Sequence, residues 1–164
     1  MTLFLGPLTS QNSWLLEEAT LGNMNWCGPR FAAQDVREKP EFAHYTRLLP
    51  ERGDFGVVAL NGDSAVGLAW ALFLSVDDPG YGYVDERTPE VSLWVSADGR
   101  GQGVGRQLLR ALIEQARERG VQRLSLSVEA GNYAWSRYRS EGFTEWPGGE
   151  ADGVMVLNLD DTHG

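Results

Sequence analysis

Six consecutive residues of this 164-residue chain, Arg100-Gly101-Gln102-Gly103-Val104-Gly105, combine an arginine with three glycines at alternate positions. Glycine has no Cβ, so such a loop lets a bulky anion approach the main chain. The loop follows an apolar run at 91–95 and opens into an amphipathic run at 104–119 that predicts a long helix. The N–H groups and dipole at a helix N-terminus favour a phosphate. The sequence therefore predicts a pyrophosphate-binding loop, and a tight turn that merely needs glycine is the alternative interpretation.

Two common phosphate-binding loops do not match this pattern. A Rossmann fingerprint requires a third glycine where this chain has Arg106. A Walker loop requires Gly-Lys followed by Ser or Thr, and the only lysine of the chain is Lys39. The pattern that remains is Arg-x-x-Gly-x-Gly between a strand and a long helix.

Around this loop the chain resembles the GCN5-related N-acetyltransferase (GNAT) superfamily. The first matching segment is Leu93-Trp94-Val95 with Arg100-x-x-Gly-x-Gly-Arg-x-Leu-Leu at 100–109, although Ala97 stands where the family usually has proline. The second is Ala134-x-x-x-Tyr-x-x-x-Gly-Phe at 134–143. The two motifs occur in the family's order and together cover about residues 90–146.

The resemblance implies acetyl-CoA as the cofactor. In that family the amides of the loop hold the CoA pyrophosphate, and the preceding strand splays from its neighbour and bonds the pantetheine arm. Carried over to this chain, the implied cofactor-binding residues are Leu93, Trp94, Val95, Arg100, Gly101, Gln102, Gly103, Val104, Gly105, Arg106 and Asn132. Arg100 and Arg106 would add charge-assisted hydrogen bonds or remain in solvent. Asn132 lies one place beyond the family's asparagine, and a helix cap is its simpler interpretation.

Acetyl transfer to an amine requires the loss of a proton, which costs roughly 4 to 5 kcal/mol at pH 7 for an alkylammonium. A general base, a water chain or desolvation must remove this proton. Glu90 is the first choice, because a carboxylate beside an apolar strand can have a raised pKa, and a solvated strand-end glutamate is the alternative. Glu129 and His44 are weaker candidates. The resemblance implies that Tyr138 is the general acid for the departing thiolate; the alternative is a tyrosine packed on the sheet.

Composition narrows the class of protein. The formal net charge of −9 argues against a nucleic-acid partner and is compatible with a cationic substrate. Cys27 is the only cysteine, so we expect neither an internal disulfide nor a zinc site, and we expect it to be buried rather than to carry an acetyl group. Residues 1–7 lack the features of a signal peptide and no run approaches 18 apolar residues, so we expect a cytoplasmic protein without a membrane segment.

We expect the acceptor pocket in the least family-like segments, 26–49 and the acidic loop at 77–88. Carboxylates beside aromatic faces suit an ammonium group, although a solvated acidic loop is the alternative. The loop carries Asp77, Asp78, Asp85 and Glu86 with Tyr81 and Tyr83. The acceptor is then an amine-bearing small molecule or peptide, and a protein N-terminus or lysine, a polyamine, an aminoglycoside and an amino acid all remain open.

The elements that position these residues are expected to form a single domain over 1–164. Strands are predicted at 2–5, 55–60, 64–76, 90–95, 121–128, 143–146 and 153–159. Helices are predicted at 104–119, 132–141 and, further upstream, 31–37 and 41–49, with another that Ser10 or Asn12 would cap and that carries Trp14 to Ala19. The fold class is α+β: a GNAT-like three-layer fold whose central twisted sheet of about seven strands is mixed, mostly antiparallel and flanked by helices on both faces. The late strands, with Trp146 and the apolar run 154–159, are candidates for pairing in a homodimer.

The sequence as a whole predicts an acetyl-CoA-dependent N-acetyltransferase that transfers the acetyl group directly to a primary amine. Two other hypotheses stay open. One is a module of the same fold that binds CoA as a sensor or scaffold without catalysis. The other is a different phosphate-bearing ligand, such as a nucleotide, in the same loop.

Overall fold

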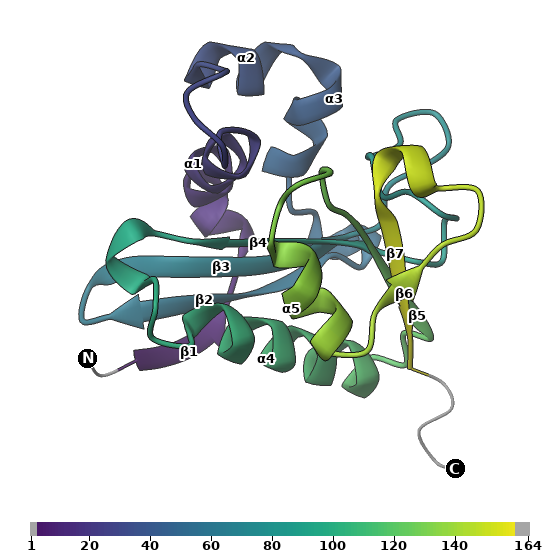
Figure 1. Ribbon diagram of the computed structural model, residues 1–164. Coiled ribbons are helices and arrows are strands. Elements are labelled where there is room, and N and C mark those ends of the chain that lie inside the picture. The colour runs from purple at the N-terminus through teal and green to yellow at the C-terminus, as the bar shows by residue number, and fades with distance from the viewer. Residues whose placement is uncertain (1–2, 160–164) are drawn as a thin grey trace.

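The computed structural model describes residues 3–159, so the two ends of the predicted domain lie outside it (Figure 1). Seven strands form one open sheet in the order β1-β2-β3-β4-β5-β7-β6. The strands are β1 (Leu3–Pro7), β2 (Phe55–Asn61), β3 (Ser64–Leu72), β4 (Glu90–Val95), β5 (Arg123–Ser127), β6 (Thr144–Glu145) and β7 (Val154–Asn158). Neighbouring strands are antiparallel except β4 and β5, which run parallel. The predicted mixed, mostly antiparallel sheet is confirmed.

Helices cover both faces of this sheet, as the three-layer prediction requires. The helices are α1 (Ser13–Met24), α2 (Ala33–Glu38), α3 (Pro40–Ala43), α4 (Val104–Glu118) and α5 (Ala134–Ser140). In Figure 1, α1, α2 and α3 lie above the sheet, while α4 and α5 lie on the opposite side. Each layer encloses its own core, because successive strand residues point to opposite faces.

The alternation along β4 shows how the two cores divide its residues. Val91 and Leu93 pack in the core under α4, with the fully buried Leu108 and Leu112 of that helix. Trp94 points to the other face, where it packs against the core that contains α1. Glu90 begins the strand on that same α1 face, and it is buried.

Three predicted elements end earlier or are broken. β3 stops at Leu72 rather than 76, because the next amide, that of Phe73, donates to Asp54 Oδ1 at 2.8 Å instead of to a strand. The predicted helix 132–141 is limited to α5, Ala134–Ser140. The predicted helix 41–49 is broken into α3 and one 3-10 turn, His44–Thr46, after which residues 47–49 are not helical.

The late strands leave less free edge than the homodimer prediction assumes. β7 pairs along its length with β5 on one side, and Met155 and Val156 pair with β6 on the other. Trp146 lies under the guanidinium of Arg123, whose Cζ is 4.8 Å from the ring centroid. Within the described residues the sheet therefore ends at the short strand β6 and at β1, and strand pairing between two copies would have to use one of these edges.

Candidate active site

A cleft of about 1280 Å³ opens between the α1–α3 layer, β4 and the start of α5. It is lined by both catalytic candidates and by every predicted cofactor-binding residue except one: Glu90, Leu93, Trp94, Val95, Arg100, Gly101, Gly103, Val104, Gly105, Arg106, Asn132 and Tyr138. The exception is Gln102, an exposed residue whose side-chain Nε2 donates to the carbonyl of Asp98 at 3.3 Å. Tertiary packing thus brings residues 90–106 and 132–138 to one site.

β4 and β5 form a wedge at the centre of this cleft. Their only registered pair is Glu90 with Ser125, and the amide of Ser125 donates to the carbonyl of Pro89 at 3.1 Å. From Val91 onward β4 stays paired with β3 but has no registered partner in β5. The β5-facing edge of residues 91–95 is therefore open to an extended ligand, in the manner of an added strand.

The glycine loop leaves a run of main-chain amides free. Gly101 and Gly103 have φ values of 77° and 78°, which glycine adopts without strain, and no atom lies within 4 Å of the position of a Cβ at either residue. Gly103 is the N-cap of α4, and the first amide after it with a helical acceptor is that of Gln107. Among the described residues, the N–H groups of 101–106 have no acceptor. Such converging donors form a site for a phosphate or pyrophosphate.

Arg137 is a cation of this site that the sequence interpretation missed. A Cβ at Gly105 would lie 2.8 Å from Arg137 Nη1, so the guanidinium packs directly on the first turn of α4. Arg100 and Arg106 line the same part of the cleft and are exposed. The sequence hinted at this role of Arg137 only through its position next to Tyr138. The contact between Gly105 and Arg137 joins α4 and α5, so no local pattern predicts it.

Glu90 lies at the closed end of the wedge and is 4% exposed. Its Oε2 accepts a 2.6 Å hydrogen bond from the hydroxyl of Tyr45, and its Oε1 is buried under the loop, where a Cβ at Gly80 would lie 2.0 Å from it. Burial raises the pKa of Glu90 to about 7, against the opposing effects of the Tyr45 hydrogen bond and of the main chain of Gly82. A carboxylate with this pKa can accept a proton near neutral pH.

Tyr138 lies on α5 and is buried beside Phe143, with ring centroids 5.8 Å apart in an edge-on arrangement. Burial raises the pKa of Tyr138 to about 12. The side chain is therefore fully protonated at pH 7 and can act as a hydrogen-bond donor within the cleft.

The weaker candidates are occupied elsewhere. Glu129 lines the cleft, but it is held by Arg30 Nη2 at 2.7 Å, and this hydrogen bond lowers the pKa of Glu129. His44 is buried and its Nδ1 is 2.9 Å from Asp78 Oδ1; it does not line the cleft. The expectation that Cys27 is buried is wrong: the side chain is exposed, and it lies outside the cleft lining.

Asn132 lies in the cleft lining, and its side chain also shapes α5. Its Oδ1 accepts a 2.9 Å hydrogen bond from the amide of Ala134, the first residue of that helix. The N-cap position of α5 is Tyr133, so this contact is an Asx turn immediately before the helix rather than the expected cap. The side-chain oxygen is engaged by the main chain.

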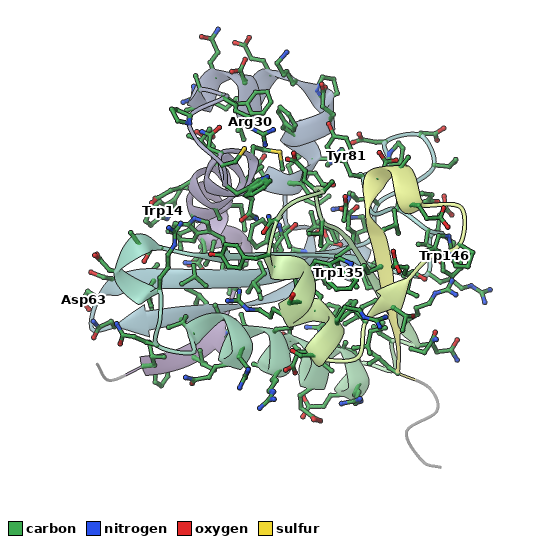
Figure 2. All side chains as sticks on the ribbon, in the orientation of Figure 1. Trp14, Arg30, Asp63, Tyr81, Trp135 and Trp146 are labelled. Atoms are coloured by element: carbon green, nitrogen blue, oxygen red, sulfur yellow. The ribbon has the colours of Figure 1, made fainter. Side chains whose placement is uncertain are left out.

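Both predicted acceptor segments reach the cleft, but with different residues from those expected. Segment 26–49 contributes Trp26, Arg30, Phe31, Phe42 and Tyr45. Of the acidic loop, only Tyr81 lines the cleft (Figure 2). The carboxylates that the sequence interpretation missed are supplied by the other side of the cleft: Glu129, Glu145, Glu150 and Asp152.

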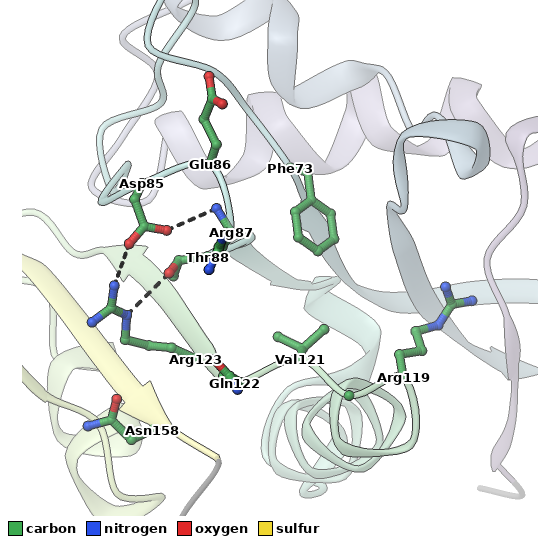
Figure 3. A pocket seen from close by; sticks show the side chains of 11 residues that line it. Phe73, Asp85, Glu86, Arg87, Thr88, Arg119, Val121, Gln122, Arg123 and Asn158 are labelled. Atoms are coloured by element: carbon green, nitrogen blue, oxygen red, sulfur yellow. Dashed lines mark hydrogen bonds and ion pairs between the residues drawn. The ribbon is translucent and has the colours of Figure 1, made fainter.

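The acidic loop is instead bound to β5 at its C-terminal end. Asp85 Oδ2 is 2.5 Å from Arg123 Nη2, and Arg123 Nε donates to the hydroxyl of Thr88 at 3.2 Å (Figure 3). These groups border a separate hollow of about 570 Å³ between the loop and the C-terminal end of α4. The polar groups there satisfy one another, so the carboxylate of Asp85 anchors the loop.

Comparison with known proteins places the chain in a family. Residues 19–143 match the Acetyltransferase (GNAT) family, so the chain belongs to it. A curated relative, the L-methionine sulfoximine/L-methionine sulfone acetyltransferase of Pseudomonas aeruginosa, is 49% identical over 47 residues. That match covers 29% of this chain and only 27% of the relative. The chain is therefore a member of a family of acetyltransferases.

Solved structures confirm the fold. The PaiA N-acetyltransferase of Thermoplasma acidophilum, solved in complex with coenzyme A, is 15% identical, with a TM-score of 0.69 over 97% of this chain and 100% of that one. The YncA protein of Salmonella typhimurium, solved with its cofactor acetyl-CoA, is 22% identical, with a TM-score of 0.66 over 98% of this chain and 95% of the other.

Two further findings concern residues 3–159. No helix in this range is long and apolar enough to cross a membrane. No group of three or more His, Cys, Asp or Glu side chains in the range is arranged to hold a metal ion.

Proposed function

We propose that the protein transfers the acetyl group of acetyl-CoA directly to a primary amine of a small molecule or peptide. The observation that carries this proposal is the arrangement of one cleft: a buried carboxylate lies at the closed end of the β4–β5 wedge, and a run of free amides lies where the loop meets α4. One end suits an amine that must lose a proton, and the other suits a pyrophosphate.

The residues present fit CoA at two places. The amides of 101–106 and the guanidinium of Arg137 would hold the pyrophosphate, with Arg100 and Arg106 as exposed cations beside it. The open edge of residues 91–95 would bond the amides of the pantetheine arm. Bound acetyl-CoA supplies the activated acetyl thioester.

In this proposal Glu90 is the general base. An alkylammonium has a pKa near 10.4, so deprotonating it at pH 7 costs roughly 4 to 5 kcal/mol in water. The pKa of Glu90, about 7, leaves the side chain half ionised at neutral pH, so the carboxylate can accept a proton. The ammonium gives one proton to this carboxylate, which frees the nitrogen lone pair to attack the thioester carbon.

Tyr138 is the proposed donor to the leaving thiolate. A thiol has a pKa near 8.5, so a phenol with a pKa of about 12 gives up its proton less readily than the thiol would. The hydroxyl therefore acts as a hydrogen-bond donor that stabilises the developing negative charge on sulfur, and the departing thiolate takes its proton from water.

The charges of the cleft favour a cationic acceptor. Four carboxylates besides Glu90 line it: Glu129, Glu145, Glu150 and Asp152. Arg30, the cation nearest to them, is neutralised by Glu129. An ammonium group would also find the aromatic faces of Phe31, Phe42 and Tyr81. The name of the Pseudomonas relative supports a small amine-bearing acceptor.

Release of free CoA thiol across a library of amines tests the function. We expect turnover with at least one primary amine and none with acetyl-CoA alone. Binding of CoA without thiol release for any small amine or peptide would favour the sensor hypothesis, and thermal stabilisation by nucleotides but not by CoA would favour a different ligand.

Tyr138→Phe is expected to lower kcat by about tenfold to a hundredfold and to leave the affinity for CoA within about twofold. The hydroxyl is lost, but the ring that packs on Phe143 is kept. Steady-state thiol release and calorimetric titration with CoA measure the two quantities. Tyr133→Phe is the matched control, because Tyr133 lines the same cleft but is 78% exposed. Unchanged turnover in Tyr138→Phe would remove Tyr138 from the reaction.

We also propose a homodimer that pairs through an edge of the sheet, β6 or β1, because these are the edges that the described residues leave open. Light scattering with size-exclusion chromatography tests this, and a monomeric mass at high protein concentration would contradict it.

A further inference from the structure

One oxygen atom, the hydroxyl of Tyr45, connects two distant parts of the cleft. It donates a 2.6 Å hydrogen bond to Glu90 Oε2 and accepts a 2.9 Å hydrogen bond from the amide of Tyr81 in the acidic loop. Tyr45 is 5% exposed, and its carbonyl accepts a hydrogen bond from Trp70 Nε1 at 3.0 Å. The ring is thus fixed in the core of the α1 layer, and its hydroxyl is presented at a defined point.

We propose that Tyr45 is the positioning residue of this site: it fixes the direction of the Glu90 carboxyl and holds the acidic loop closed over it. The inference rests on the proposed role of Glu90. Tyr45 engages Oε2, and Oε1 is buried under the main chain of the loop at Gly80. Without the hydroxyl, Glu90 would lose the hydrogen bond that sets the direction of its carboxyl.

The loop packs tightly against this pair. A Cβ at Gly80 would lie 2.0 Å from Glu90 Oε1 and 2.6 Å from the Tyr45 hydroxyl. A Cβ at Gly82 would lie 2.6 Å from the carbonyl carbon of Leu126 on β5. Only a main chain without side chains at these two positions can come so close, and its approach removes water from the carboxyl.

The surroundings of Glu90 are otherwise uncharged or already paired. β3 and β5 place Leu72 and Ser125 opposite it, and α1 contributes Thr20 to the cleft. The acidic loop and the turn His44–Thr46 bring Asp78 and His44, which pair with each other at 2.9 Å. Tyr45 is therefore the one side chain that hydrogen-bonds Glu90 among the described residues.

Tyr45→Phe is expected to raise the pKa of Glu90 by about one unit, because the lost hydrogen bond favours the ionised form. The acidic limb of the pH profile of kcat/KM would then move from about pH 7 to about pH 8. A purely structural defect would lower the whole profile without moving its midpoint. Tyr81→Phe is the matched control, because it keeps the main-chain amide that donates to the Tyr45 hydroxyl. The midpoint of its pH profile is expected to stay at the wild-type value.

Carbon-13 NMR titration of the Glu90 carboxyl in the folded protein, assigned with Glu90→Gln, gives a second readout that needs no catalysis. A Glu90 pKa that is the same in Tyr45→Phe and the wild type would overturn the inference. If the NMR midpoint moves but the activity profile does not follow, Glu90 is not the base, and the proposed catalytic role fails while the contact with Tyr45 is verified. Circular dichroism and thermal melts establish that each variant is folded.

Discussion

Glu90→Gln is expected to lower kcat by about two to four orders of magnitude at pH 7 and to leave the affinity for acetyl-CoA within about threefold. Glutamine has nearly the same shape but cannot accept a proton. The amine must then lose its proton to water, against the cost set by its own pKa. Steady-state thiol release with the best amine of the library measures the loss, and calorimetry measures CoA binding.

Glu129→Gln is the matched control for this substitution, because Glu129 lines the same cleft but is paired with Arg30. It is expected to keep kcat within about tenfold of the wild type. Retention of more than a tenth of the turnover by Glu90→Gln, or an equal loss in both variants, would contradict the assignment of Glu90 as the base.

The same carboxyl gives a prediction for stability. The folded-state pKa of Glu90 is about 7, above the ordinary glutamate pKa of 4.5, so the folded protein binds more protons than the unfolded chain between these two values. The stabilisation is complete below pH 4.5 and is lost as the pH rises through 7. The loss amounts to about 3 kcal/mol.

Glu90→Gln lacks this titration. We therefore compare the free energy of unfolding of Glu90→Gln with that of the wild type at each pH. The variant's value minus the wild-type value is expected to increase by up to about 3 kcal/mol from pH 5 to pH 8, because only the wild type loses stability. Urea denaturation of both proteins at the two pH values measures this difference. A stability difference that does not change with pH would mean that the carboxyl titrates alike in the folded and unfolded chains.

Gly103→Trp is expected to abolish the thermal stabilisation that CoA gives the wild type. At a concentration of CoA 100 times its dissociation constant, the wild type should gain about 2.7 kcal/mol, or roughly 5 to 10 °C in Tm. Gly103 caps α4 with φ of 78° and has open space where the side chain would be. An indole there would fill the space above the free amides.

Gly120→Trp is the matched control at the other end of α4. Gly120 has φ of 76° and also has nothing within 4 Å of a Cβ position, so the backbone strain is similar, but the residue lies outside the cleft lining. Its Tm should fall by an amount similar to that of Gly103→Trp, with the response to CoA retained. A full response to CoA in Gly103→Trp would show that the loop does not hold the pyrophosphate.

The parts of the site that are built from adjacent residues could be predicted from the sequence. β4 has its predicted bounds, and the glycine loop opens into α4 as expected, because turns and helix starts depend on nearby backbone conformations. The family and the fold class were predicted from these same motifs and are confirmed. The roles of individual residues stay predictions.

Contacts between distant residues could not be predicted in this way. Tyr45 and Glu90 are 45 positions apart, and Arg30 and Glu129 are 99 apart. The acidic loop was expected to supply carboxylates to the cleft, but Asp85 turns away to Arg123 and the loop contributes Tyr81 instead. No local sequence pattern predicts these partners, because each depends on which distant side chain the fold brings next to the residue in question.

From its residue order alone, the chain specified a glycine loop at the start of an amphipathic helix, since glycine conformations and helix ends are settled within a few residues. Folding in three dimensions decided which carboxyl can serve as a base. Glu90 and Glu129 are the same residue type, but Glu90 is buried beside a hydroxyl and its pKa rises, whereas Glu129 meets a guanidinium and its pKa falls. Desolvation and charge pairing are set by neighbours from other elements, and only the folded chain brings these together.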